Sequence, residues 1–189
     1  MKPAFADPVF GAQEAFRALM DAMARPGRIQ DCGVLADLPD GLSPAAAAAL
    51  LALADAETPV WTDASGEARD WIAFHTGAPL VAEPGEALFL LATGAMPALA
   101  TLELGTDEMP QDSATLIMQT DALDAGTGWH LAGPGIEHEH RLAAAGMPSD
   151  FVQQWSSNRR AFPRGVDLVL CAGSKLAALP RTTQVKEAG

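Results

Sequence analysis

The densest group of residues able to do chemistry is the sequence LAGPGIEHEH, which runs from Leu131 to His140. Its Gly133-Pro134-Gly135 unit could cradle a phosphate, and its histidines and glutamates could bind a metal. A phosphate loop needs consecutive backbone N–H groups, usually at a helix N-terminus, whereas Pro134 lacks an N–H and the following residues alternate as a strand does. Neither GxxxxGK[ST] nor GxGxxG after a strand occurs in the sequence. We therefore expect a turn between two strands.

The histidines of this segment are the candidate metal ligands. His138 and His140 are two residues apart, so a regular strand would place both on one face. His130, eight residues before His138, is a possible third ligand from a paired strand. The competing reading is a solvent-facing side of a strand. The first reading describes an autonomous metal-assisted enzyme, and the second requires no metal.

His75 is a further candidate, at the end of an expected helix. It follows Ala68, Trp71 and Ile72 at spacings typical of one helix face. An imidazole there complements the helix dipole. The side chain either packs in the core or contacts a ligand.

Arginines supply the candidate anion sites. Arg164 and Asp167 stand at the start of an expected strand, and Arg181 and Thr182 follow another. Arginine suits fixed, bidentate contacts to phosphate or carboxylate. Each cluster could anchor an anion or a partner chain, or could form a structural Arg–Asp pair. If Arg25 converged with Arg164 and Arg181, the three could bind a phosphonate or a triphosphate.

Other catalytic signatures are missing from the sequence. There is no GxSxG elbow, and neither Cys32 nor Cys171 has a histidine nearby. Cys171 lies in the apolar run VDLVLCAG, which predicts an inert thiol with a raised pKa. The lysines are Lys2, Lys175 and Lys186, and none has the setting of a buried Schiff-base lysine. We expect no cofactor.

The composition and net charge limit the classes of partner that the protein is expected to bind. The 189 residues carry a formal charge of −12, which argues against nucleic acid and anionic membranes because both favour a basic face. No apolar run approaches the roughly 18–20 residues needed to cross a bilayer, and the N-terminus does not resemble a signal peptide. These features predict one domain, 1–189, in the cytoplasm. Because 49% of residues are hydrophobic and only 19% charged, exposed apolar surface is also expected.

The elements that must position these residues alternate along the chain. Helices are expected at 12–24, 43–55, 68–76 and 148–162, with Ser43 and Ser149 as N-caps. Strands are expected at 29–35, 58–62, 79–83, 86–93, 114–123, 129–133 and 136–142, with a hairpin loop at 124–128 and two closing strands around an Ala-Gly-Ser-Lys turn. Phe16, Leu19, Met20 and Met23 mark the apolar face of the first helix. The pattern predicts an α/β fold in which helices flank a mixed β-sheet.

Seven stretches occur in the order and spacing of one known family. They are FRALMDAMARPGRI, LALADAETPVW, FHTGAPLV, ATLIMQT, LAGPGI, FPRGVDLVL and LAALPRTT. Together they span about Phe10 to Thr183 and resemble the PhnH subunit family of the bacterial carbon–phosphorus lyase system, which degrades phosphonates.

The resemblance implies a fold like that of pyridoxal-phosphate-dependent transferases, without the cofactor. It implies assembly with the PhnG, PhnI and PhnJ subunits, and a homodimer when the chain is alone, with PhnJ pairing through a related surface in the assembly. With PhnL, the G, H and I subunits are associated with joining an alkylphosphonate to the ribose of ATP, displacing adenine and forming a ribose 1-phosphonate 5-triphosphate. The leading hypothesis is therefore a subunit that is not catalytic alone. The alternatives are the metal-assisted enzyme and an anion-binding protein.

Overall fold

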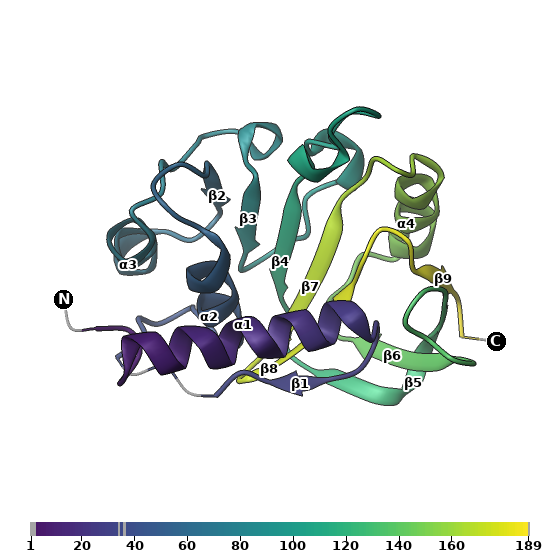
Figure 1. The fold of residues 1–189 in the computed structure, drawn as a ribbon, viewed down its shortest axis with the longest axis horizontal. Coiled ribbons are helices and arrows are strands. Elements are labelled where there is room, and N and C mark those ends of the chain that lie inside the picture. The colour runs from purple at the N-terminus through teal and green to yellow at the C-terminus, as the bar shows by residue number, and fades with distance from the viewer. Residues whose placement is uncertain (1–2, 34, 36, 189) are drawn as a thin grey trace.

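The computed structural model describes residues 3–33, 35 and 37–188, and within them the chain forms four α-helices and nine β-strands. The helices are α1 (Pro8–Ala24), α2 (Pro44–Leu53), α3 (Gly66–Thr76) and α4 (Phe151–Arg160). The strands are β1 (Gln30–Asp31), β2 (Val60–Thr62), β3 (Phe89–Ala92), β4 (Thr115–Gln119), β5 (Leu123–Ala132), β6 (His140–Ala144), β7 (Asp167–Ala172), β8 (Lys175–Leu179) and β9 (Gln184–Lys186). The predicted mixed α/β architecture is confirmed (Figure 1).

The main sheet has six strands in the order β1-β8-β7-β4-β3-β2. The strands β2, β3, β4 and β7 are parallel, and β8 and β1 extend the sheet in antiparallel pairing. A second, antiparallel sheet has the order β6-β5-β9. Figure 1 shows this smaller sheet and α4 on one side of the molecule, with α1 running across the base of the main sheet.

Two hydrophobic cores lie on the two faces of the main sheet. Successive side chains of the parallel strands point to opposite faces of the sheet and so belong to different cores. Leu91, Ile117 and Val169 face α1, α2 and α3. Leu90, Leu116 and Leu168 face Phe151 and Trp155 of α4 and the smaller sheet. Burial on both faces explains the continuous apolar runs of these strands.

Helix α2 forms as its sequence predicts. Ser43 is the N-cap and accepts a hydrogen bond from Ala46 N at 3.4 Å, and Pro44 occupies the first turn. Residues 45–50 are all buried, so the helix is enclosed on more than one side as expected for an Ala- and Leu-rich sequence. Helix α3 ends at Gly77 with φ +66, which is also as predicted.

Helix α1 differs from expectation in the face that it buries. Leu19 is buried, together with Ala15 and Ala22, whereas Phe16 and Met20 are 44% and 55% exposed. Small residues allow α1 to lie close to α2 and β8, and the larger side chains then point outward. The predicted apolar face was therefore wrong for Phe16 and Met20.

Two predictions around β5 and β6 were also wrong. Residues 124–128 form no hairpin loop but part of β5, where a register shift between Ala125 and Trp129 is a bulge. Glycines mark bulges as well as turns, and Gly128 lies so close to β6 that a side chain would meet Leu142 O. Residues 136–139 are irregular, so β6 begins only at His140.

Two other local predictions failed. The expected strand at 79–83 is reduced to one bridge between Leu80 and Val60. Helix α4 has Asp150 and not Ser149 at its N-cap. The Asp150 carboxylate makes no capping bond, and it accepts from Gln154 Nε2 at 3.0 Å.

Candidate functional site

The Gly133-Pro134-Gly135 unit is a turn between β5 and β6, as predicted, and it is the centre of the candidate site. Ile136 N donates to Gly133 O at 3.1 Å, which closes the turn. Gly133 has φ +129, and a Cβ there would lie 3.2 Å from Thr182 O. Gly135 has φ +81, and a Cβ there would overlap Ala24 O. The turn is therefore held between the end of α1 and the segment after β8, and only glycine fits at both positions.

Thr182 belongs to the turn that joins β8 to β9, and this turn lies against α4. Trp155 Nε1 donates to Thr183 O at 2.9 Å, and Arg159 Nε donates to Thr182 O at 3.4 Å. Gly133 and Thr182, which are far apart in the sequence, thus come together beside the C-terminal end of α4.

Arg181 and Asp167 form a structural pair. The guanidinium binds the carboxylate through Nε at 3.2 Å and Nη2 at 2.6 Å, and Nη1 donates to Pro110 O at 2.7 Å. Arg181 N also donates to Asp167 Oδ1 at 2.7 Å. Both side chains are only 15% exposed. This bidentate geometry fixes the start of β7 to the end of β8 and leaves the Arg181 guanidinium fully engaged.

The other two candidate arginines bind different carboxylates. Arg164 contacts Asp107 at 3.1 Å, and Arg25 contacts Asp21 of α1 at 2.8 Å. The three arginines Arg25, Arg164 and Arg181 therefore do not share one anion site, and that hypothesis is not supported by the geometry.

The histidines near the turn do not share a common partner. His130 Nδ1 lies 2.8 Å from Glu139 Oε1, and His140 Nδ1 lies 2.7 Å from Pro26 O. His138 is 89% exposed and its Nε2 is 3.9 Å from Glu137. The hydrogen bond from His130, followed by charges nearby, lowers the pKa of Glu139. Across residues 3–33, 35 and 37–188, no three metal-ligating side chains gather at a common point.

His75 lies apart from this turn, where the start of α1 meets the end of α3. Its ring contacts Trp71 at a centroid distance of 4.3 Å and Phe74 at 5.1 Å. It lines a hollow with Pro8 and Ala12 of α1. Burial lowers the pKa of His75, and its Nε2 is enclosed without a partner among the described residues. The packed interpretation fits this setting.

The thiols show no sign of activation. Burial is the main cause that raises the pKa of Cys32 to about 12 and the pKa of Cys171 well above its ordinary value. In the described part of the chain, no histidine makes a hydrogen bond with a serine, threonine or cysteine side chain, so no hydrogen-bonded nucleophile–base pair is seen there.

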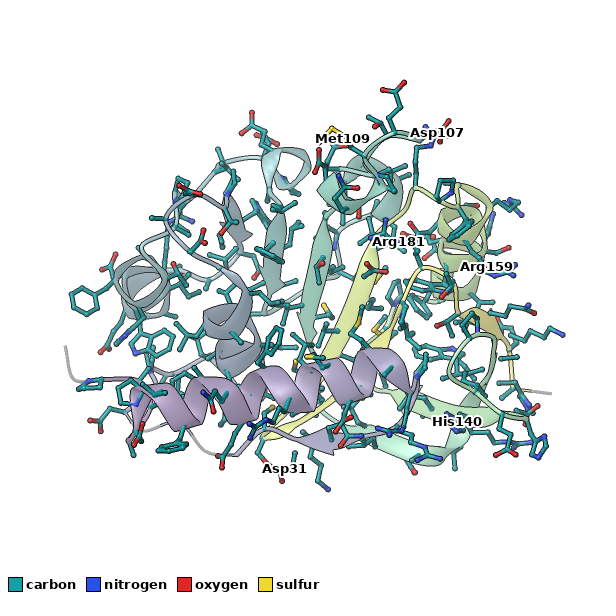
Figure 2. The ribbon with its side chains drawn as sticks, in the orientation of Figure 1. Asp31, Asp107, Met109, His140, Arg159 and Arg181 are labelled. Atoms are coloured by element: carbon teal, nitrogen blue, oxygen red, sulfur yellow. The ribbon has the colours of Figure 1, made fainter. Side chains whose placement is uncertain are left out.

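Two residues of this corner were not among the site candidates named from the sequence. Arg159 and Phe162 line a hollow of about 290 Å³ with Pro134 and Thr182. Figure 2 shows Arg159 at α4 and Arg181 beside β7. The available signal was the pair Arg159-Arg160 at the end of an expected helix, followed closely by Phe162.

A membrane-spanning helix is not found among the described residues, since none is both long and apolar enough. Comparison with known proteins places the chain in a family. The family model described as "Bacterial phosphonate metabolism protein (PhnH)" matches residues 3–186.

Two curated relatives agree with this match. A Rhizobium meliloti (strain 1021) protein named "Alpha-D-ribose 1-methylphosphonate 5-triphosphate synthase subunit PhnH" is 43% identical over 188 residues, covering 97% of this chain and 94% of that protein. A Stutzerimonas stutzeri protein named "Putative C-P lyase subunit protein HtxG" is 34% identical over 181 residues, covering 94% and 87%. The chain therefore belongs to the PhnH family of bacterial phosphonate metabolism proteins.

Proposed function

We propose that the chain is the PhnH subunit of a carbon–phosphorus lyase assembly, in which it supports the joining of an alkylphosphonate to the ribose of ATP and is not catalytic alone. The observation that carries this proposal is the relative that is 43% identical over almost the whole of both chains and is named a subunit of the ribose methylphosphonate triphosphate synthase. The partners proposed are PhnG, PhnI and PhnJ.

A subunit needs a surface for its neighbours, and α1 offers one. Val9, Phe16 and Met20 lie at i, i+7 and i+11 and are 64%, 44% and 55% exposed, so they form one apolar stripe on the helix. Phe10, 66% exposed, stands beside them. We call these four residues the α1 stripe. Exposed apolar side chains that gather on one face of a helix are typical of protein interfaces.

We infer that a partner subunit covers the α1 stripe in the assembly, and that a second copy of the chain covers it when the chain is alone. The family resemblance supports PhnJ as that partner. Aromatic and methionine side chains are enriched in interface centres and carry much of the binding energy there.

Further features are proposed from the same family membership. The 189 residues act as one domain, because both cores are built on the same six-stranded sheet. The fold is proposed to be a cofactor-free relative of the pyridoxal-phosphate-dependent transferases, and Lys175 and Lys186 are both exposed. A cytoplasmic location is proposed as well.

Co-expression with the three proposed partners tests the assignment. A tagged chain should co-purify with PhnG, PhnI and PhnJ, and the double variant Phe16→Ser/Met20→Ser should reduce recovery of the partners by tenfold or more, since buried interface aromatics each contribute about 1–2 kcal/mol or more.

Met109→Ser is the matched control. Met109 is 48% exposed and lies on the opposite side of the molecule from α1 in Figure 2. It should leave recovery unchanged. A wild-type chain that emerges alone in the presence of all three partners would refute the subunit role, whereas equal effects of both variants would refute only the α1 surface.

A further inference from the structure

The hollow between Pro134, Arg159, Phe162 and Thr182 has features that a structural corner does not need. Its volume, about 290 Å³, is near the lower end of small-molecule sites, which begin at about 300 Å³. Phe162 is 61% exposed, although aromatic side chains of this size are normally mostly buried. The hollow is thus lined by an exposed aromatic residue, an arginine, a threonine and a proline.

Three independent contacts fix its walls. The Gly133-Pro134-Gly135 turn is confined by Thr182 O on one side and Ala24 O on the other. The Thr182 segment is held to α4 by the Trp155–Thr183 hydrogen bond and to β7 by the Arg181–Asp167 pair. Walls that are held in place in advance reduce the entropy lost when a ligand binds.

Within the part of the chain that the structure describes, Arg159 is held in place by one hydrogen bond, and the rest of its guanidinium is free to bind a ligand. Its Nε donates to Thr182 O at 3.4 Å, while Nη1 and Nη2 have no partner among the described residues. Its neighbour Arg160 differs, since it donates to the hydroxyls of Ser156 and Ser157 at 3.4 and 2.8 Å. A paired set of free guanidinium donors matches the oxygens of a phosphate or phosphonate.

The simplest competing explanation is that Arg159 and Arg160 complement the negative end of the α4 dipole. That effect accounts for two cations in the last turn of α4. It does not account for the exposed Phe162 ring, or for the hollow formed by three separate segments. Neither arginine is paired with a carboxylate among the described residues of a chain of net charge −12, so the local charge favours an anion.

We propose that this hollow is a binding site for a small organophosphorus anion. The Arg159 Nη1 and Nη2 groups bind phosphoryl or phosphonyl oxygens, and Phe162 packs against the planar or apolar part of the same ligand. The class of ligand rests on the proposed function, since both a nucleoside triphosphate and an alkylphosphonate carry this chemistry.

Calorimetric titration of the purified full-length chain with ATP and, separately, with methylphosphonate tests the site. The titrations are done at low ionic strength with chelator present, because salt screens exposed charges. We expect at least one of the two probes to bind, and Arg159→Gln to weaken that binding by tenfold or more. Loss of a charge-assisted hydrogen bond from a bidentate arginine has an effect of this size.

Arg160→Gln is the matched control. It removes the same charge from the next residue in the sequence, whose side chain does not line the hollow. It should change affinity by less than about threefold. Phe162→Ala should weaken binding of ATP more than that of methylphosphonate, since only ATP carries an aromatic base. Binding of ATP alone, of methylphosphonate alone or of both supports the site and identifies the source of the phosphorus group.

The proposal is overturned if neither probe binds at about 1 mM, or if both arginine variants weaken binding equally, which would indicate general charge attraction. It is also overturned if Arg159→Gln keeps ligand affinity but loses the partner subunits, because the corner would then be a protein interface. The titration uses the isolated chain, so its failure leaves the subunit assignment, which is tested by co-purification, unaffected.

Discussion

Arg181 and Arg159 lie on neighbouring segments and have opposite environments. The Arg181 guanidinium is 15% exposed and bonded to Asp167, Pro110 and Pro163. Arg159 is exposed and donates only its Nε, to Thr182 O, among the described residues. The comparison shows why residue type alone does not define a site: the same side chain is a structural tie where carboxylate and carbonyl groups saturate it, and a potential ligand contact where they do not.

The largest expected effect on stability comes from breaking the enclosed Arg181–Asp167 pair. Asp167→Ala leaves the Arg181 charge enclosed without its carboxylate, so we expect the free energy of unfolding to fall by about 3–5 kcal/mol. Asp107→Ala breaks the more exposed Arg164 pair and should cost only about 0–1 kcal/mol.

Denaturant unfolding of the two variants against the wild type measures both changes. If Asp167→Ala and Asp107→Ala cost the same, the Arg181–Asp167 pair does not hold β7 to the end of β8 as its geometry indicates.

The sequence predicted the secondary structure best where one local rule decides it. Ser43 and Pro44 start α2, Gly77 ends α3, and the Ala-Gly-Ser-Lys turn joins β7 to β8, each through chemistry within a few residues. The sequence failed where two local interpretations were equal. Gly126 and Gly128 signal a turn as well as a bulge, and pairing with β6 selects the bulge.

The site was less predictable because its contacts are not local. Asp167 and Arg181 were named in two separate clusters, each of which could have been an anion site or a structural Arg–Asp pair. Only the bidentate geometry shows that the two residues pair with each other. The hollow depends on Pro134, Phe162 and Thr182 meeting across two sheets and a helix. The pattern of residues within one segment does not predict contacts between distant segments. The family resemblance, in contrast, correctly indicated phosphonate metabolism.

The next effect concerns the turn that forms one wall of the hollow. Gly135→Ala would place a Cβ against Ala24 O at a positive φ, so we expect a loss of about 2–4 kcal/mol in the free energy of unfolding. Gly173→Ala, at φ +57 with no atom of the described residues beyond its chain neighbours within 4 Å of the added Cβ, isolates the backbone contribution and should cost about 1–2 kcal/mol. Equal losses measured by denaturant unfolding would mean that the Gly135 turn is not packed against α1.

Replacing the exposed Arg159 should change the stability much less. Arg159→Gln removes one long, exposed hydrogen bond, so the free energy of unfolding should change by no more than about 0.5 kcal/mol. The same unfolding experiment measures it. A loss of about 2 kcal/mol or more would show that Arg159 is a structural tie like Arg181, and that its free donors are not available to a ligand.

His75 is intermediate between the two arginines, because its Nε2 is enclosed but has no hydrogen-bond partner among the residues that the structure describes. Burial lowers the pKa of His75 below its ordinary 6.5. Between the folded and the ordinary pKa, the unfolded chain binds more protons than the folded chain, so stability rises with pH in that window and is lost as the pH falls through it. Thermal unfolding at about pH 5.5 should therefore occur at a lower temperature than at about pH 7.5, and His75→Leu should flatten this dependence.

His138→Leu provides the matched control, since His138 is 89% exposed and lies in the β5–β6 turn. It should leave the slope against pH unchanged. Other groups contribute to the absolute slope, and the difference between the two variants isolates His75 from them. If the two variants show the same slope, the packing of His75 against Trp71 and Phe74 does not disfavour the charged ring. His75 would then behave as a solvent-exposed side chain and not as a buried one.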